Sequence, residues 1–449
     1  MTVWHRTKAK INRFLDNPLP EACTTHEPTC PLPYEITEMI IAHLTHDPRT
    51  LKACSLTCRS WYIVAAPYIH HTLILARGVT HSGLKPLSKL RKRGLMPFIQ
   101  EIRVEQPRGA VNWFVPRAFG RRSLRYFSAF AKVHTLRLQG LKIYRFFPHV
   151  ERYFGQFSPT LRSIVLADPH CSPRQLSHFL SLFSNLDDVK IWGLDTDIPN
   201  VTALDAMLVP SSTLKLRGRL ALGVFNWVET WTHLIASCGG LRFRHMELCT
   251  SVYSTPPLLE ACAETLETLR FYATDRSQSK SFCISGLPTD SSSLRTVTHS
   301  LSFPEFNLSR LCALRSLQVA DLTNNHDTTQ DQNHAILMEV FSTITSPVFS
   351  ELVIILVGDE IICLPREAMM FQTLRKMYEV RPFKLVFSFE GPPPVPREGR
   401  SVPAGVRRKL EKTLESVATK GFLDFLDSPP TIRVATRVRH DEWDFPDFD

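Results

Sequence analysis

Two cysteines, Cys54 and Cys58, lie four residues apart in the segment LKACSLTCRSW, and thiols at short spacing can bind a metal or exchange electrons. A zinc site would need two further ligands, and Cys23, His26 and Cys30 lie upstream in the segment EACTTHEPTC. That segment lacks the closely paired cysteines of a zinc knuckle, and a redox pair would favour a two-residue spacer beside a strand. We therefore interpret Cys54 and Cys58 as small apolar packing residues, and we expect no metal and no cofactor.

The residues around the two cysteines have the periodicity of short helices. Apolar residues recur every four positions after Pro33, whose missing N–H suits a first helical turn. Two more helices are predicted, which begin near Pro48 and near Thr57. Three helices of this size make a core that is marginal alone, so we expect the unit to depend on a partner.

This stretch resembles the F-box, a short helical motif. The resemblance rests on the opening Leu-Pro-x-Glu-Ile (32–36), on the apolar positions that follow it, and on the ending Cys-Arg-x-Trp (58–61). In F-box proteins these helices bind a Skp-type adaptor, which links them to a cullin–RING ubiquitin ligase. The resemblance therefore implies an adaptor-binding face that comprises Leu32, Pro33, Ile36, Ile40, Leu44, Leu51, Cys54, Cys58 and Trp61.

A second pattern, apolar-x-x-apolar-x-apolar, returns along the rest of the chain. Clear copies include VHTLRL (133–138) and LDDVKI (186–191), and weaker copies include SSTLKL (211–216), CGGLRF (238–243) and LRTVTH (294–299). Helix-like segments lie between the copies, and the sequence resembles degenerate leucine-rich repeats. The resemblance implies a solenoid, in which stacked strand–helix units bury one continuous core. A generic α/β domain remains the alternative.

In each copy, the residue between the second and third apolar positions is expected to face away from the core. Such residues would line the concave surface of a solenoid. Six of them are basic, and we expect them to bind an acidic or phosphorylated protein substrate: Arg103, Arg137, Lys190, Lys215, Arg242 and Arg270. The corresponding residues of the other copies are Val165, Thr298, Gln318, Val353 and Val386.

The charge of the chain is uneven, because residues 1–150 contain 23 Lys and Arg against 8 Asp and Glu. A basic region at 76–146 keeps nucleic-acid binding open as an alternative. However, the sequence lacks the signatures of an RNA-binding sheet and the spacing of a zinc finger, so a nucleic-acid partner is not favoured.

Other classes of protein are disfavoured by missing motifs. The sequence has no Gly-rich phosphate loop, nucleophile elbow or paired metal-binding histidines, so we expect no catalytic residues and no enzymatic activity. The longest apolar runs are too short to span a bilayer. Eleven cysteines without a secretory signal favour reduced thiols, and we expect a cytoplasmic or nuclear protein without a membrane partner.

The predicted fold is α/β, with a small helical F-box followed by an irregular leucine-rich-repeat-like solenoid of parallel strands. The expected segments are a flexible basic N-terminus (1–30), the F-box (31–75), the substrate-binding solenoid (76–390), a Pro/Gly-rich linker or loop (391–406), a C-terminal cap (407–440) and an acidic tail (441–449). The predicted function is substrate recognition in a Skp–cullin–F-box E3 ubiquitin ligase. The alternatives are nucleic-acid binding and a repeat scaffold without a ligase role.

Overall fold

The structure is a computed structural model that describes the following residues: 32–45, 47–76, 84–105, 130, 132–140, 143, 151, 154–192, 215–223, 231–232, 235–236, 239–248, 256–273, 307–321, 340–357, 367–391, 412, 415, 423–424 and 426–436. The predicted N-terminal segment (1–30) and acidic tail (441–449) lie outside these residues, as does nearly all of the predicted linker (391–406).

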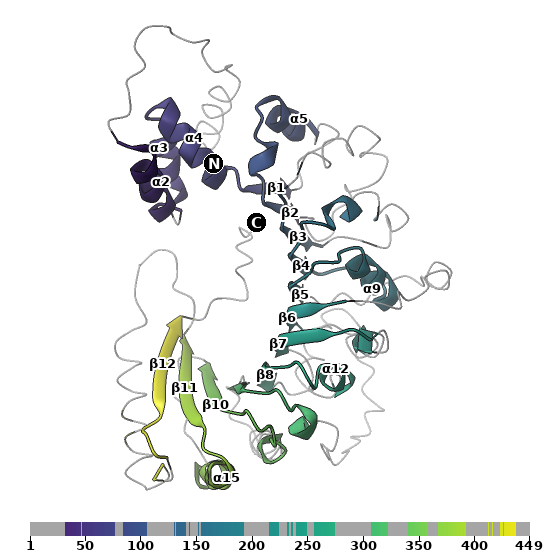
Figure 1. Cartoon of the computed structure of the whole chain (residues 1–449), viewed down its shortest axis with the longest axis vertical. Helices are drawn as coiled ribbons and strands as arrows, with labels where there is room; N and C mark the ends of the chain where they lie inside the picture. The colour runs from purple at the N-terminus through teal and green to yellow at the C-terminus, as the bar shows by residue number, and fades with distance from the viewer. Residues whose placement is uncertain are drawn as a thin grey trace, which may run out of the picture.

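Three short helices come first, and they form a unit of their own (Figure 1). They are α2 (Tyr34–His43), α3 (Pro48–Ser55) and α4 (Arg59–Ile69). Helix α4 contacts both α2 and α3. The helices predicted near Pro33, Pro48 and Thr57 are therefore confirmed, although α4 continues through Pro67.

The strands described form one parallel sheet of 12 strands, in which every strand pairs with its neighbours in the sequence. The strands are β1 (Thr72–Ala76), β2 (Glu101–Glu105), β3 (Thr135–Gln139), β4 (Ser163–Ala167), β5 (Asp188–Trp192), β6 (Arg217–Leu222), β7 (Arg242–Leu248), β8 (Thr268–Ala273), β9 (Ser316–Asp321), β10 (Glu351–Val357), β11 (Lys384–Gly391) and β12 (Thr431–Thr436). Strand β12 lies within the predicted C-terminal cap and extends the sheet beyond β11.

The sheet lines the inside of an open arc, and the helices that follow its strands lie on the outside (Figure 1). These helices include α5 (Leu84–Lys92), α9 (Pro173–Ser181), α12 (Pro256–Ala261) and α15 (Glu367–Val380), with 3-10 turns η1 (Met96–Phe98), η3 (Gly155–Phe157) and η5 (Leu308–Arg310). N-terminal helices followed by parallel strands confirm the predicted α/β fold. The leucine-rich-repeat assignment stays a prediction.

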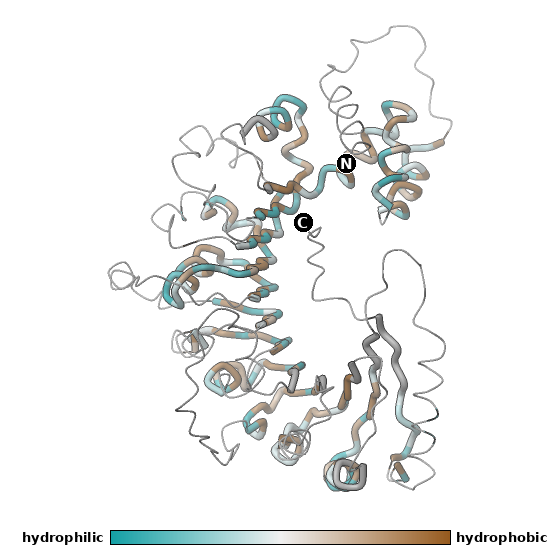
Figure 2. The backbone as a smooth tube through the Cα atoms, turned by 180° about the vertical axis from the view of Figure 1, so that it is seen from behind, coloured by the Kyte–Doolittle hydropathy of each residue, from teal (hydrophilic) through white to brown (hydrophobic). Residues whose placement is uncertain are grey.

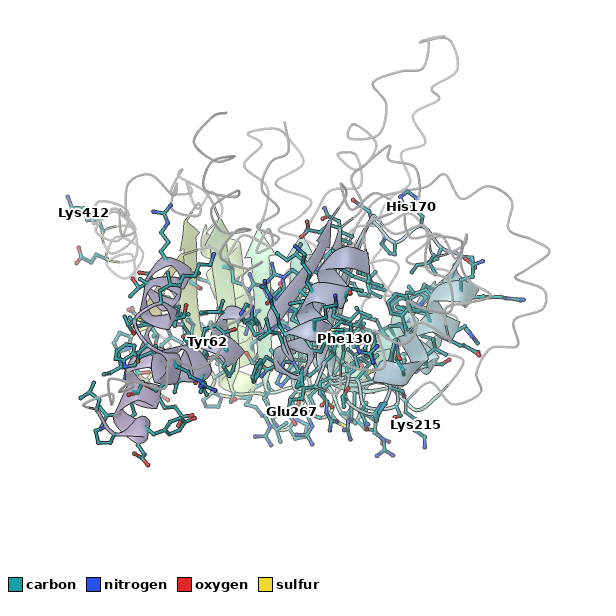
Figure 3. The ribbon with its side chains drawn as sticks, turned by 90° about the horizontal axis from the view of Figure 1, so that it is seen from above. Tyr62, Phe130, His170, Lys215, Glu267 and Lys412 are labelled. Carbon is teal, nitrogen blue, oxygen red and sulfur yellow. The ribbon has the colours of Figure 1, made fainter. Side chains whose placement is uncertain are left out.

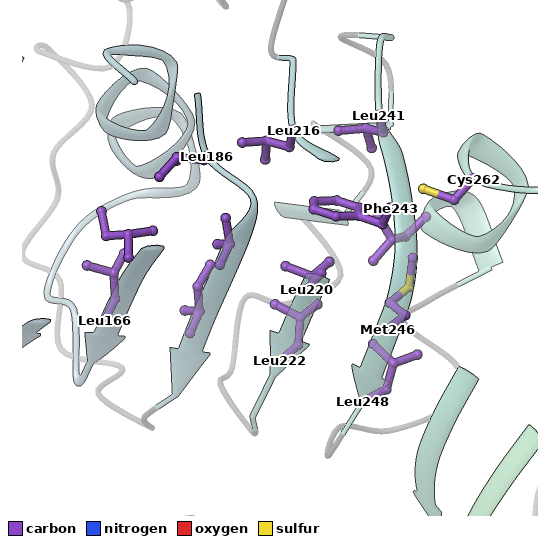
Figure 4. Close-up of a cluster of buried hydrophobic side chains, with 14 of the residues drawn as sticks. Leu166, Leu186, Leu216, Leu220, Leu222, Leu241, Phe243, Met246, Leu248 and Cys262 are labelled. Atoms are coloured by element: carbon purple, nitrogen blue, oxygen red, sulfur yellow. The ribbon is translucent and has the colours of Figure 1, made fainter. Parts of the chain in front are cut away.

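One continuous core fills the space between the sheet and the outer helices (Figure 4). On β5, the side chains of Val189 and Ile191 are fully buried, whereas the residue between them is half-buried on the opposite face. Leu220 and Leu222 repeat the arrangement on β6. Because side chains alternate along a strand, β5 and β6 each give two apolar residues to the core, and the intervening residue points to the inner face.

Local sequence determines where an outer helix starts, as α9 shows. The hydroxyl of Ser172 accepts a hydrogen bond of 3.2 Å from the backbone N–H of Gln175, and the Gln175 side-chain oxygen accepts one of 3.2 Å from the N–H of Ser172. Pro173 occupies the first helical position. This capping box satisfies two N–H groups that have no partner within the helix.

The junction between the helical unit and the sheet is short. His70 and His71 are the residues between the end of α4 and the start of β1. The carbonyl of His71 accepts hydrogen bonds from the N–H groups of Gln100 at 2.8 Å and Glu101 at 2.9 Å. The three helices therefore continue directly into the first strand of the sheet.

None of the helices in the described ranges combines the length and the apolar character required to cross a membrane.

Candidate functional site

The three N-terminal helices have a small core of their own. Ile41, Leu51, Val64 and Ala65 are almost fully buried in it. Leu44, Cys54, Trp61, Tyr68 and Ile69 are partly buried and pack against it. These residues hold the helices together.

Asp47 fixes the start of α3. Its Oδ1 accepts hydrogen bonds from the backbone N–H groups of Arg49 at 3.0 Å and Thr50 at 3.2 Å. Its Oδ2 accepts one of 2.6 Å from the hydroxyl of Thr50. The hydroxyl of Thr50 and these N–H groups lower the pKa of Asp47, because they favour its charged form. With Pro48 at the first helical position, this cap explains why a helix of eight residues begins there.

Large apolar side chains are exposed on the same helices, which Figure 2 also shows to be rich in hydrophobic residues. Nine large hydrophobic residues are exposed in the described part of the chain, and six of them lie between residues 32 and 63. We call these six the exposed apolar set: Leu32, Tyr34, Ile36, Met39, Leu56 and Ile63. Exposed apolar side chains concentrated in so short a segment are typical of an interaction site.

The nine residues predicted to form the adaptor-binding face fall into three groups. Leu32, Pro33 and Ile36 are exposed. Leu51 is only 2% exposed and belongs to the helical core, so it supports the helices from within. The remaining five are half-buried: Ile40, Leu44, Cys54, Cys58 and Trp61.

The prediction omitted Tyr34, Met39, Leu56 and Ile63, which are all more than half exposed. Met39 could have been found from the sequence, because it lies three residues after Ile36 and therefore on the same side of α2.

The two cysteines of this segment have different environments. Cys54 packs against the helical core. Cys58 precedes α4, and its Sγ lies 3.1 Å from Oγ of Ser60. Among the described residues, no group of three or more His, Cys, Asp or Glu side chains is arranged to hold a metal ion. Cys23, His26 and Cys30 lie outside the described residues.

The inner face of the sheet is the second surface of interest. The strand register aligns one residue of each strand in what we call the central row: Ile74, Arg103, Arg137, Val165, Lys190, Ala221, Glu247, Arg270, Gln318, Val353, Val386 and Thr431. Four of the six basic residues predicted for the concave surface therefore lie in one row.

Lys215 and Arg242 do not lie in that row, although both are exposed, and their role in substrate binding stays a prediction. Ala221 and Glu247 occupy the corresponding positions on β6 and β7. The reason is that the predicted copies end at residues 216 and 243, whereas the strands run further along the chain, over Arg217–Leu222 and Arg242–Leu248. Lys215 lies just before β6, and Arg242 is the first residue of β7.

The weak copy that contains Thr298 cannot be placed in the sheet from the described residues. Residues 294–299 lie outside the described residues, and β8 pairs directly with β9. The central row therefore passes from Arg270 to Gln318. The predicted basic region at 76–146 is also described only in part.

Carboxylates accompany the basic residues of the central row. Glu101 accepts a hydrogen bond of 3.0 Å from Nε of Arg103 and forms an ion pair with Arg137 on the next strand. Burial raises the pKa of Glu101, but the hydrogen bond from Arg103 and the charge of Arg137 outweigh this effect, so the pKa is lowered overall. Glu101 is therefore charged at neutral pH.

The same arrangement recurs further along the sheet. Nζ of Lys190 lies 3.7 Å from a carboxylate oxygen of Asp188, and Nε of Arg270 lies 3.7 Å from one of Glu247. Each of the four basic residues in the central row thus has a carboxylate at ion-pairing distance. The row is a network of opposite charges, and it offers less free positive charge than the sequence suggested.

A comparison with protein families matches the first of these two surfaces. Residues 29–76 match the family described as F-box-like, and the match ends at the last residue of β1. A search of curated proteins finds no match for the chain. The segment that carries the exposed apolar set is thus the segment that is similar to an F-box, and the sheet beyond β1 lies outside that similarity.

Proposed function

We propose that the protein is the substrate-recognition subunit of a Skp–cullin–F-box E3 ubiquitin ligase. In this proposal, the N-terminal helices bind a Skp-type adaptor, and the inner side of the arc holds a protein substrate. The protein itself has no catalytic role, because adaptors of this type bring a substrate to the ligase.

The exposed apolar set is the observation that carries the proposal. Transfer of a large apolar side chain from water into a packed interface stabilises a complex by roughly 1.5–3 kcal/mol when burial is complete. Ile36 is 42% exposed and Met39 is 59% exposed, so both have apolar surface to lose on binding. Their position within the segment that matches the F-box-like family connects this surface with adaptor binding.

Two exposed hydrophobic residues outside the N-terminal helices provide a control. Val348 and Val380 are also exposed, at 42% and 87%, but they lie near β10 and at the end of α15. Substitution of either pair by aspartate adds the same charge to exposed positions, and only one pair lies on the proposed adaptor-binding helices.

The test is co-purification with a Skp-type adaptor after co-expression. The Ile36→Asp/Met39→Asp variant should lose the adaptor while its circular dichroism spectrum stays unchanged, and the Val348→Asp/Val380→Asp variant should retain it. Adaptor binding by the first variant, or equal loss in both, would refute the proposal.

A further inference from the structure

Five basic residues cluster where β6 and β7 begin. We call them the basic rim: Lys215, Arg217, Arg219, Arg242 and Arg244. All five are exposed. Figure 3 shows both Lys215 and Glu267, which precedes β8, at the lower edge of the molecule. The basic rim therefore lies at the start of the strands, beside the central row and not within it.

A β-bulge shapes the rim. Gly218 has a φ of 78°, and a Cβ at this position would lie 2.1 Å from the carbonyl oxygen of Asp187. The same carbonyl accepts a hydrogen bond of 2.7 Å from the N–H of Arg219. The register shift leaves Arg244 as an additional residue of β7. Bulges turn side chains in new directions, and here the bulge adds a fifth basic residue to the rim.

Carboxylates compensate three of the five charges. Nε of Arg217 lies 2.8 Å from Oδ1 of Asp187, and the Arg219 guanidinium lies 2.8 Å from Oε2 of Glu247. Nε of Arg244 lies 3.9 Å from Oε1 of Glu267, which is a weak contact between exposed groups.

The two other side chains of the rim differ from these three. Within the ranges that the structure describes, the side chains of Lys215 and Arg242 form no ion pair and no hydrogen bond. Arg242 is aligned with Arg217 on the neighbouring strand. Because neighbouring strands lie about 4.8 Å apart, the two guanidinium groups can reach the same anion.

We propose that the basic rim binds a phosphorylated segment of the protein substrate, a proposal that rests on the proposed function. A phosphate group carries about −1.5 to −2 charges and three strong acceptor oxygens. It therefore matches the two uncompensated charges of Lys215 and Arg242. Arginine also binds phosphate through two parallel hydrogen bonds from one guanidinium, which Arg242 can supply.

The same features disfavour a nucleic acid as the occupant. Proteins that bind single strands combine a continuous positive groove with aromatic rings on which bases stack. Phe243, the aromatic residue between Arg242 and Arg244, is fully buried in the core. Asp187 and Glu267 flank the basic rim on the β5 and β8 sides and would repel a chain of successive phosphates.

Peptide binding to the full-length protein, co-expressed with a Skp-type adaptor, tests the proposal. The probe is a fluorescein-labelled peptide library with a fixed central phosphoserine and degenerate flanking positions, compared with the same library containing serine. We expect the wild-type protein to bind only the phosphorylated library. Lys215→Ala/Arg242→Ala should weaken binding by at least about ten-fold, because two charge-assisted contacts are lost.

Neither the Lys215 nor the Arg242 side chain forms an ion pair with a described residue, so the double variant should fold normally. Lys92→Ala/Lys376→Ala is the matched control, because both lysines are exposed on outer helices, α5 and α15. It removes the same charge and should bind as the wild-type protein does. No binding of the phosphorylated library, equal binding of both libraries, or equal loss in both variants would overturn the proposal.

Two further measurements distinguish this proposal from its alternatives. If a single-stranded oligonucleotide binds the basic rim more tightly than the phosphopeptides do, the rim is a nucleic-acid site and the proposal is wrong. Adaptor co-purification is measured on the same samples. If the protein binds the phosphopeptides but does not co-purify with the adaptor, the ligase function is wrong and phosphate binding by the basic rim stands. If it co-purifies with the adaptor but does not bind the phosphopeptides, phosphate binding by the basic rim is wrong and the ligase function stands.

Discussion

The guanidinium of Arg219 on β6 donates a hydrogen bond of 2.8 Å to Oε2 of Glu247 on β7. The Glu247 side chain is 6% exposed, and Nε of Arg270 on β8 lies 3.7 Å from its other oxygen. One buried carboxylate therefore joins three neighbouring strands in the middle of the sheet.

Glu247→Ala should lower the free energy of unfolding by about 2 kcal/mol, because the variant removes a buried carboxylate that pairs with two arginines. Urea denaturation followed by circular dichroism measures the change. Glu379→Ala is the control, since Glu379 is exposed on α15. Coincident unfolding curves for Glu247→Ala and the wild type would show that the carboxylate does not stabilise the sheet.

Gly218→Ala should destabilise the protein and reduce phosphopeptide binding by the basic rim. A Cβ would lie 2.1 Å from the carbonyl oxygen of Asp187, so the bulge has to change. Gly239 also has a positive φ, of 69°, but a Cβ there meets no atom within 4 Å. Comparison of the two alanine variants by thermal unfolding isolates the contact from the cost of the backbone conformation, which is about 1 kcal/mol or more. Equal melting temperatures would argue against a tightly held bulge.

Protonation of His70 should weaken the folded state at low pH. Burial lowers the pKa of His70, and the positive charges of Arg93 and Lys52 lower it further. As the pH falls below the ordinary value of 6.5, the unfolded chain binds a proton that the folded chain resists, so stability decreases. Above that value, both states are neutral and the contribution disappears.

The measurement is the melting temperature of the wild type and of His70→Gln between about pH 7.5 and about pH 5.5, the range in which histidine titrates. The wild type should lose more stability than the variant over this range. Parallel curves for the two proteins would show that another group causes the pH dependence.

The N-terminal helices were accessible from the sequence because their signals are local. Asp47 and Pro48 indicate the start of a helix within four residues, and the apolar periodicity can be recognised over a single helical turn. The periodicity does not determine which apolar side chains are buried in the core of the three helices and which are exposed. Leu51 and Ile36 both fit the predicted face, yet one is buried and the other is exposed, and only the packing of α4 on α2 and α3 decides between them.

The inner surface was harder to predict because its geometry depends on pairing between strands. Residues 214–222 contain four alternating apolar positions, so the sequence fits two registers equally well. Pairing with β5, in which Asp188 is aligned with Arg219, gives the register that places Ala221 in the central row. Because the strand was expected at 238–243, Glu247 was not predicted to lie in the central row, and its ion pair with Arg270 was therefore missed.

The direct passage from α4 into β1 determines how a bound substrate would be presented. With two residues between these elements, and with the carbonyl of His71 held by two N–H groups from the neighbouring segment, the angle between helices and sheet has little freedom. In the proposed complex, the distance from a substrate on the basic rim to the site of ubiquitin transfer would be nearly constant. The choice of the lysine that receives ubiquitin would then depend on its separation from the bound phosphorylated segment, and lysines closer or farther along the substrate would be left unmodified.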